Sequence, residues 1–159
     1  MVREVTARKG AAAERDRVLL ELALGTGIRL WGLVGLNVGH VDLDAKHLTV
    51  RVNGGRVETR FLSSDLRVPL WKYMRRRRQE ATDSSALFLL NRGKRISNRQ
   101  VQGRFHLWTA WAGIHRRGLS VHSPRHTFGT RLYRQTRDLV LVGKASGHRR
   151  STKPAVRPG

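Results

Sequence analysis

The sequence predicts one mainly helical α+β domain in which a small three-stranded antiparallel sheet packs on helices. The chain has 159 residues, 39% of them hydrophobic, which is enough for one compact core and too short for two domains. Several segments carry apolar residues at helical spacing. Asn53-Gly54 stands between two short β-type runs, which is a strong hairpin signal.

The first half of the chain supplies two helices and the sheet. Residues 14–24 have an apolar face at helical spacing, and the glycine-containing turn at residues 25–27 ends that helix. A short second helix is expected directly afterwards. Two strands alone would be marginal in water, so we expect three. The second helix is expected at residues 29–36, and the strands at residues 41–43, 48–52 and 56–62.

The second half of the chain is predicted to be helical. A helix from residue 64 runs into the four arginines at 75–78, which we interpret as a solvated helix face that could also follow a DNA backbone. Ser97 and Gln100 form a capping box before a helix whose apolar positions include Trp108 and Trp111. Both tryptophans are expected in the core rather than stacked on bases.

Two further helices are expected toward the end of the chain. Ser123-Pro124 has the form of an N-cap followed by proline at the first helical position. Asp138 caps a last helix that is expected to end at Gly147. The domain is therefore expected over residues 14–148, after a disordered lead at residues 1–13 and before a disordered tail at residues 149–159.

Composition points to a polyanionic partner. Lysine and arginine total 32 against 11 acidic residues, a formal net charge of +21. Such a charge would cause strong self-repulsion unless nucleic acid lay against the surface. Of these cations 26 are arginines, which bind phosphate oxygens in pairs. With no cysteine, disulfides and thiol catalysis are excluded, and a cytoplasmic protein without a membrane span or signal peptide is expected.

Three short motifs carry the candidate chemistry. Residues 25–29 read Gly-Thr-Gly-Ile-Arg, residues 122–130 read His-Ser-Pro-Arg-His-Thr-Phe-Gly-Thr, and residues 147–148 read Gly-His. The second motif is the most specific, because it resembles the His-x-x-Arg signature of the tyrosine recombinases of the phage integrase family. Order and spacing agree with that family from about residue 14 to residue 148. Residues 122 and 125 also face one way on a first helical turn, where backbone amides favour an anion.

The resemblance implies that the domain cuts and rejoins double-stranded DNA through a phosphotyrosyl intermediate. It implies that Arg29 and Arg125 hold the scissile phosphate, that His122 transfers protons and that His148 donates a further hydrogen bond. No metal or other cofactor is implied, because the arginines supply the positive charge; other recombinase subunits are possible partners. The arginines that we expect to contact DNA elsewhere are Arg56, Arg60, Arg99 and Arg104.

The sequence departs from the family pattern at two catalytic positions. The hairpin loop lacks the family's lysine, and Arg56 is the nearest cation, although an arginine is a poor proton donor. Arg157 stands where the nucleophilic tyrosine is expected, and neither Tyr73 nor Tyr133 lies in the right motif.

Further departures lie late in the chain: Pro124 and Ser146 replace leucines of the family pattern, and the prolines at 154 and 158 would break the helix that carries the tyrosine. We therefore suspect a shifted or interrupted reading frame after His148.

Several alternatives stay open. The chain could bind DNA without chemistry, receive its tyrosine from a neighbouring subunit, or be an inactive product of a disrupted gene. Asp42 and Asp44 alternate as metal ligands might, but a strand end explains them better. His106 and His115 do not share a helical face and are interpreted as surface or interface residues.

Overall fold

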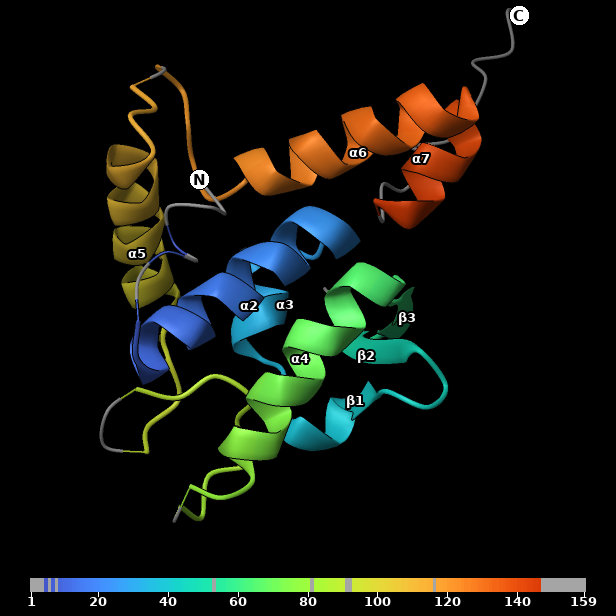
Figure 1. Cartoon of the computed structure of the whole chain (residues 1–159). Coiled ribbons are helices and arrows are strands. Elements are labelled where there is room, and N and C mark those ends of the chain that lie inside the picture. Colours follow the sequence, from blue (N-terminus) through green and yellow to red (C-terminus); the bar gives the residue numbers. More distant parts are fainter. Residues whose placement is uncertain are drawn as a thin grey trace, which may run out of the picture.

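The computed structural model describes residues 5, 7, 9–52, 54–80, 82–90, 93–115 and 117–146. The predicted fold class is confirmed: helices dominate, and one antiparallel sheet has the strand order β1-β2-β3 (Figure 1). In chain order the elements are α2 (Ala11–Thr26), α3 (Leu30–Val34), the 3-10 helix η1 (Val38–His40), β1 (Val41–Asp42), β2 (His47–Arg51), β3 (Val57–Phe61), α4 (Ser64–Arg77), α5 (Asn98–Trp111), α6 (Ser123–Thr136) and α7 (Leu139–Ala145).

Helix α2 is the central element of the fold. It lies between α4 and α5, and α6 crosses beside it (Figure 1). Its apolar residues Val18, Leu19, Leu20 and Leu22 are each at most 2% exposed. The helix begins at Ala11 rather than at the predicted residue 14, so part of the expected disordered lead is helical. Three successive alanines have the highest helix propensity, which explains the earlier start.

The sheet presents two different faces. Leu48 pairs with Arg60 and Val50 pairs with Glu58, and residues directly opposite each other lie on the same face of a sheet. Leu48 and Val50 are buried in the core. Arg60 and Glu58 therefore project from β3 toward the interior side, whereas Phe61, on the outer face, is 80% exposed.

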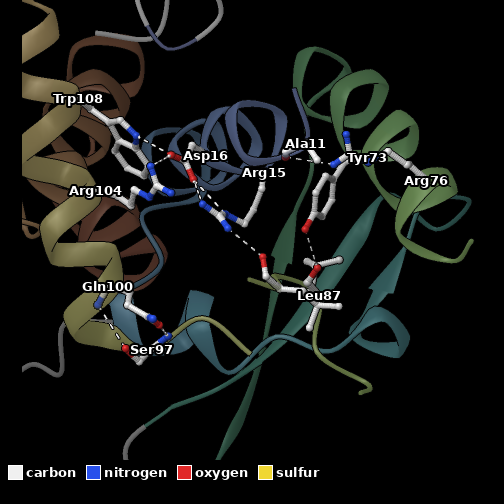
Figure 2. A network of polar contacts seen from close by, with 11 residues as sticks. Ala11, Arg15, Asp16, Tyr73, Arg76, Leu87, Ser97, Gln100, Arg104 and Trp108 are labelled. Carbon is white, nitrogen blue, oxygen red and sulfur yellow. Dashed lines mark hydrogen bonds and ion pairs between the residues drawn. The ribbon is translucent and has the colours of Figure 1, made fainter. Parts of the chain in front are cut away.

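A buried polar network joins α2 to α5 (Figure 2). Asp16 accepts hydrogen bonds from Arg15 at 3.0 and 2.6 Å and from the Trp108 indole N–H at 3.2 Å. The Arg15 guanidinium also donates to the Leu89 carbonyl at 2.9 Å. The Arg104 guanidinium lies 3.6 Å from Oδ2 of Asp16, the oxygen that also accepts from Trp108. The side chains of Arg15 and Asp16 are only 3% exposed, so each of these charges depends on the other.

The expectation that residues 75–78 form a solvated face is wrong for one of them. Arg75 and Arg78 are exposed, but Arg77 is 4% exposed. Its guanidinium donates to the carbonyls of Ala86 at 3.0 Å and Ser84 at 2.6 Å. Arg77 thus satisfies backbone carbonyls of the segment that follows α4, which a run of identical residues could not reveal.

The helix caps are largely as predicted. Ser97 and Gln100 form the reciprocal capping box of α5, and Asp138 accepts two backbone N–H bonds at the start of α7. The N-cap predicted for α6 is wrong by one residue. His122 is the N-cap, and the Ser123 hydroxyl instead accepts from the Ser120 N–H at 3.0 Å. Ser123 is therefore committed to the preceding turn.

The core prediction for the tryptophans also holds. Trp108 is 1% exposed, and Trp111 is partly buried against the core cluster. Helix α7 ends at Ala145, and the predicted end at Gly147 lies outside the described residues. None of the described helices combines the length and the apolarity that crossing a lipid bilayer requires.

Substituting Asp16→Ala should destabilise the fold by about 3–5 kcal/mol, because Arg15 would be left buried without its counter-ion. Urea unfolding followed by circular dichroism would measure the loss. Asp83→Ala is the matched control, since Asp83 is exposed. Equal losses in the two variants would show that the Asp16 network does not hold α2 against α5.

Candidate active site

The turn after α2 positions the first candidate residue, Arg29. Gly27 caps α2 in the left-handed conformation at φ 63°, which favours glycine. The Thr26 hydroxyl donates to the Leu22 carbonyl at 2.6 Å and accepts from the Ile28 N–H at 3.4 Å. Arg29 then follows in extended conformation as the N-cap of α3, and it is half-buried.

The second candidate, Arg125, reaches this turn from the first turn of α6. Its guanidinium donates to the Gly27 carbonyl at 2.9 Å across 98 residues of sequence. One turn later, Phe128 packs so closely that a Cβ at Gly27 would overlap its ring. The contact therefore fixes α6 against the end of α2 and brings two of the predicted phosphate ligands together.

Arg125 lies among other charges. Burial and the neighbouring guanidinium groups of Arg29 and Arg60 lower the pKa of Arg125, and the carboxylate of Glu58 acts in the opposite direction. Three cations and one anion thus share a half-buried site. Positive charge in excess at a partly desolvated position favours an anionic ligand with several acceptor oxygens, as a phosphodiester has.

His122 lies at the N-terminal end of α6 and is exposed. Its carbonyl accepts from the N–H groups of Arg125 at 3.1 Å and His126 at 3.2 Å, which fixes its backbone. The prediction that His122 and Arg125 share one helical turn is confirmed, and the backbone amides of that turn add to the positive potential. The catalytic role of His122 stays a prediction, and His148 lies outside the described residues.

The four arginines expected to contact DNA occupy different environments. Arg60 belongs to the cluster around Arg125. Arg56 and Arg99 are exposed, before β3 and on the first turn of α5. Arg104 pairs with buried Asp16 at 3.6 Å, so part of its charge is already compensated within the fold.

Sequence reasoning missed Glu58. The residue carries no motif, and only the alternation of side chains along β3 could have indicated it. That period of two places Glu58 and Arg60 on the same face of the strand.

Neither tyrosine in the sequence lies in the family's nucleophile motif, and the structure places them in different environments. Tyr73 is 2% exposed and donates to the Leu87 carbonyl at 2.9 Å. Burial, followed by the charge of Glu80, raises the pKa of Tyr73 to about 12. Tyr133 is partly buried on α6, with the Arg137 guanidinium 6.0 Å from its ring centroid.

The described residues contain no cluster of three or more histidine, aspartate or glutamate side chains that could hold a metal. Asp42 accepts from the Ala45 N–H at 2.7 Å and so closes the turn after β1. This hydrogen bond supports the structural interpretation of Asp42 over the metal-pair alternative.

Fold and cluster together define a helical α+β domain with a half-buried group of arginines, and comparisons identify its family. The family model described as "Phage integrase family" matches residues 4–153. The chain therefore belongs to the phage integrase family. It is 36% identical to tyrosine recombinase XerC of Salmonella typhi over 136 residues, and 36% identical to XerC of Yersinia pestis over 144 residues.

The chain spans less than half the length of these relatives: 86% of the chain matches 45% of the Salmonella protein, and 91% matches 47% of the Yersinia protein. Solved structures agree on the fold. XerA recombinase superposes with a TM-score of 0.81 at 25% identity, covering 92% of this chain and 53% of that one. XerH recombinase, solved bound to its difH substrate, also gives 0.81 at 21% identity, covering 92% and 44%. The fold is that of a tyrosine recombinase catalytic domain.

Substituting Gly27→Ala should both destabilise the domain and weaken anion binding. The added Cβ would overlap the ring of Phe128. The alanine would also have to adopt the left-handed backbone conformation of Gly27, which alone costs about 1–2 kcal/mol. Thermal unfolding and phosphate-dependent stabilisation would measure the two effects. Gly39→Ala is the control, because nothing lies within 4 Å of its added Cβ. A Gly27→Ala protein that behaves like the control would contradict the docking of α6 on this turn.

The phenol of Tyr73 should stay protonated until the pH approaches about 12. In a Tyr133→Phe protein, Tyr73 is the remaining tyrosine, so tyrosinate absorbance reports on it alone. Because its folded pKa is raised above its ordinary value of 10, its contribution to stability is complete below pH 10 and is lost as the pH rises toward 12. A midpoint near pH 10 in protein shown to be folded would refute the burial of this phenol.

Proposed function

We propose that this chain serves site-specific DNA recombination by holding the scissile phosphodiester of double-stranded DNA between Arg29 and Arg125. The observation that carries the proposal is the contact of Arg125 with the turn that presents Arg29, inside a cluster with excess positive charge. Membership of the phage integrase family supports the same reading. The substrate named for XerH and the activity named for the XerC proteins belong to longer chains, of which this chain matches 44% and 45%.

In this mechanism the arginines act on the phosphate. Each guanidinium donates to a non-bridging oxygen and stabilises the charge that builds up in the pentavalent transition state. Loss of one preorganised donor of this kind typically slows a reaction about 100- to 1,000-fold. His122, exposed beside Arg125, is placed to transfer a proton, and His148 is assigned a hydrogen bond to the phosphate by family resemblance.

The nucleophile sets the limit of what this chain does alone. One of its two tyrosines, Tyr73, is buried, and the other, Tyr133, lies on α6 outside the expected motif. Arg56 cannot replace a lysine as a general acid at neutral pH. We therefore propose that residues 1–159 bind the phosphodiester without forming a covalent intermediate. Cleavage would require a tyrosine from outside residues 1–159, such as one supplied by another recombinase subunit.

Further DNA contacts are proposed on either side of the cluster. Arg56 and Arg99 are exposed and make no ion pair with another described residue, so they are available to the backbone of a duplex. Arg60 is proposed as a contact within the cluster, and Arg104 as a weaker one because Asp16 shares its charge. We propose that the chain acts on nucleoid DNA in the bacterial cytoplasm, because a net charge of +21 favours binding to a polyanion.

The test is the binding of a fluorescein-labelled mixed-sequence DNA duplex across a salt series. Arg29→Ala and Arg125→Ala should each weaken binding about tenfold or more, because each removes a charge-assisted contact. Each should also reduce the magnitude of the log–log salt slope by about 0.9. Lys72→Ala on α4 is the control, since Lys72 is exposed and lies outside both the cluster and the arginine run at residues 75–78.

Unchanged affinity and slope in both cluster variants would refute the phosphate site. A second readout addresses the chemistry: mixing the chain with a nicked duplex and resolving the products under denaturing conditions. No covalent protein–DNA band is expected from the chain alone. A band that disappears in Tyr133→Phe would show that our assignment of the nucleophile is wrong.

A further inference from the structure

Glu58 and Arg60 form an ion pair beside the phosphate-binding arginines. The Arg60 Nη2 lies 2.5 Å from the Glu58 carboxylate, and the two side chains are 13% and 26% exposed. They stand two residues apart on β3 and share the face of Leu48 and Val50. The strand register directs both side chains to the interior face of the sheet. The charges of both residues affect the pKa of Arg125.

The Arg60 guanidinium is only partly used by the fold. Nη2 is held by Glu58, and Nη1 makes only a long contact of 3.4 Å to the carbonyl of Thr59. The Nε–H is buried and has no hydrogen-bond partner among the described residues. A buried donor left unpaired is unfavourable, so this N–H is available to an acceptor that the described residues do not supply.

We infer that Arg60 is a third guanidinium of the phosphodiester site and that Glu58 is the residue that positions it. Glu58 holds one amino group of Arg60, so that the remaining donors face the oxygens gripped by Arg29 and Arg125. This inference rests on the proposed function and extends it. Neither residue lies in the motifs that define the site, and Glu58 itself touches no DNA.

Replacing Glu58 distinguishes a positioning role from simple repulsion of DNA. Removing a carboxylate from a DNA-binding face should by simple electrostatics strengthen binding, because the carboxylate repels phosphate. If Glu58 positions Arg60, Glu58→Gln should weaken binding instead, since a neutral amide holds the guanidinium less firmly than the carboxylate does. Once Arg60 is absent, Glu58 has nothing left to position, and only its repulsion remains.

The experiment measures duplex affinity and salt slope for Glu58→Gln, Arg60→Gln and the double variant, using the labelled mixed-sequence duplex. Glu58→Gln should lower the affinity about tenfold, comparable to the loss of one charge-assisted hydrogen bond. Arg60→Gln should also lower it and reduce the slope magnitude by about 0.9. In the Arg60→Gln background, adding Glu58→Gln should raise the affinity about two- to threefold. This reversal of sign supports a positioning role that a general loss of stability would not produce.

Arg60→Lys adds a conservative comparison, because it keeps the charge but not the fork of donors. It should retain the salt slope and lose affinity. Thermal unfolding of each variant confirms that the protein is folded. Tighter binding by Glu58→Gln in both backgrounds would overturn the inference and show that Glu58 only repels DNA. If that occurs while Arg125→Ala still weakens binding, the proposed function survives; if Arg125→Ala has no effect, the proposed function itself fails.

Discussion

The hydrogen bond from Arg125 to the Gly27 carbonyl is the contact on which the site depends. It joins the first turn of α6 to the end of α2, two segments that are 98 residues apart. Gly27 allows this contact for two reasons. Its φ of 63° turns the chain after α2, and its lack of a side chain leaves room for Phe128. Arg125 therefore binds the fold with one nitrogen and keeps the others for an anion.

That contact requires α2 to be held in place at its other end. The Arg15–Asp16 pair fastens the beginning of α2 to Trp108 of α5 and to the carbonyl of Leu89. Arginine has a structural use elsewhere too: Arg77 and Arg95 each bond two backbone carbonyls. The charge of +21 is thus not all available to a polyanion, because part of it stabilises irregular backbone inside the fold.

Much of this arrangement could be predicted from local sequence signals. The hairpin, the capping box at Ser97 and the apolar face that contains Trp108 depend on short-range periodicity, and the structure confirms them. The burial of Arg77 and the partnership of Glu58 with Arg60 could not be predicted, because each depends on where a helix or strand lies against another element. The same holds for His122 replacing Ser123 as the N-cap, since Ser120 competes for the Ser123 hydroxyl.

The cluster around Arg125 has the charge balance expected of the phosphate site that we propose. Three guanidinium groups that share a half-buried position repel one another, and burial adds to the cost of their charge. Glu58 offsets part of that repulsion from within the fold, and within the described part of the chain its ion pair is with Arg60. One carboxylate offers fewer acceptor oxygens to three guanidinium groups than the successive phosphodiesters of a duplex do. In the proposed function, Glu58 thus helps to hold the arginines together in the free protein, and the remaining positive charge attracts DNA.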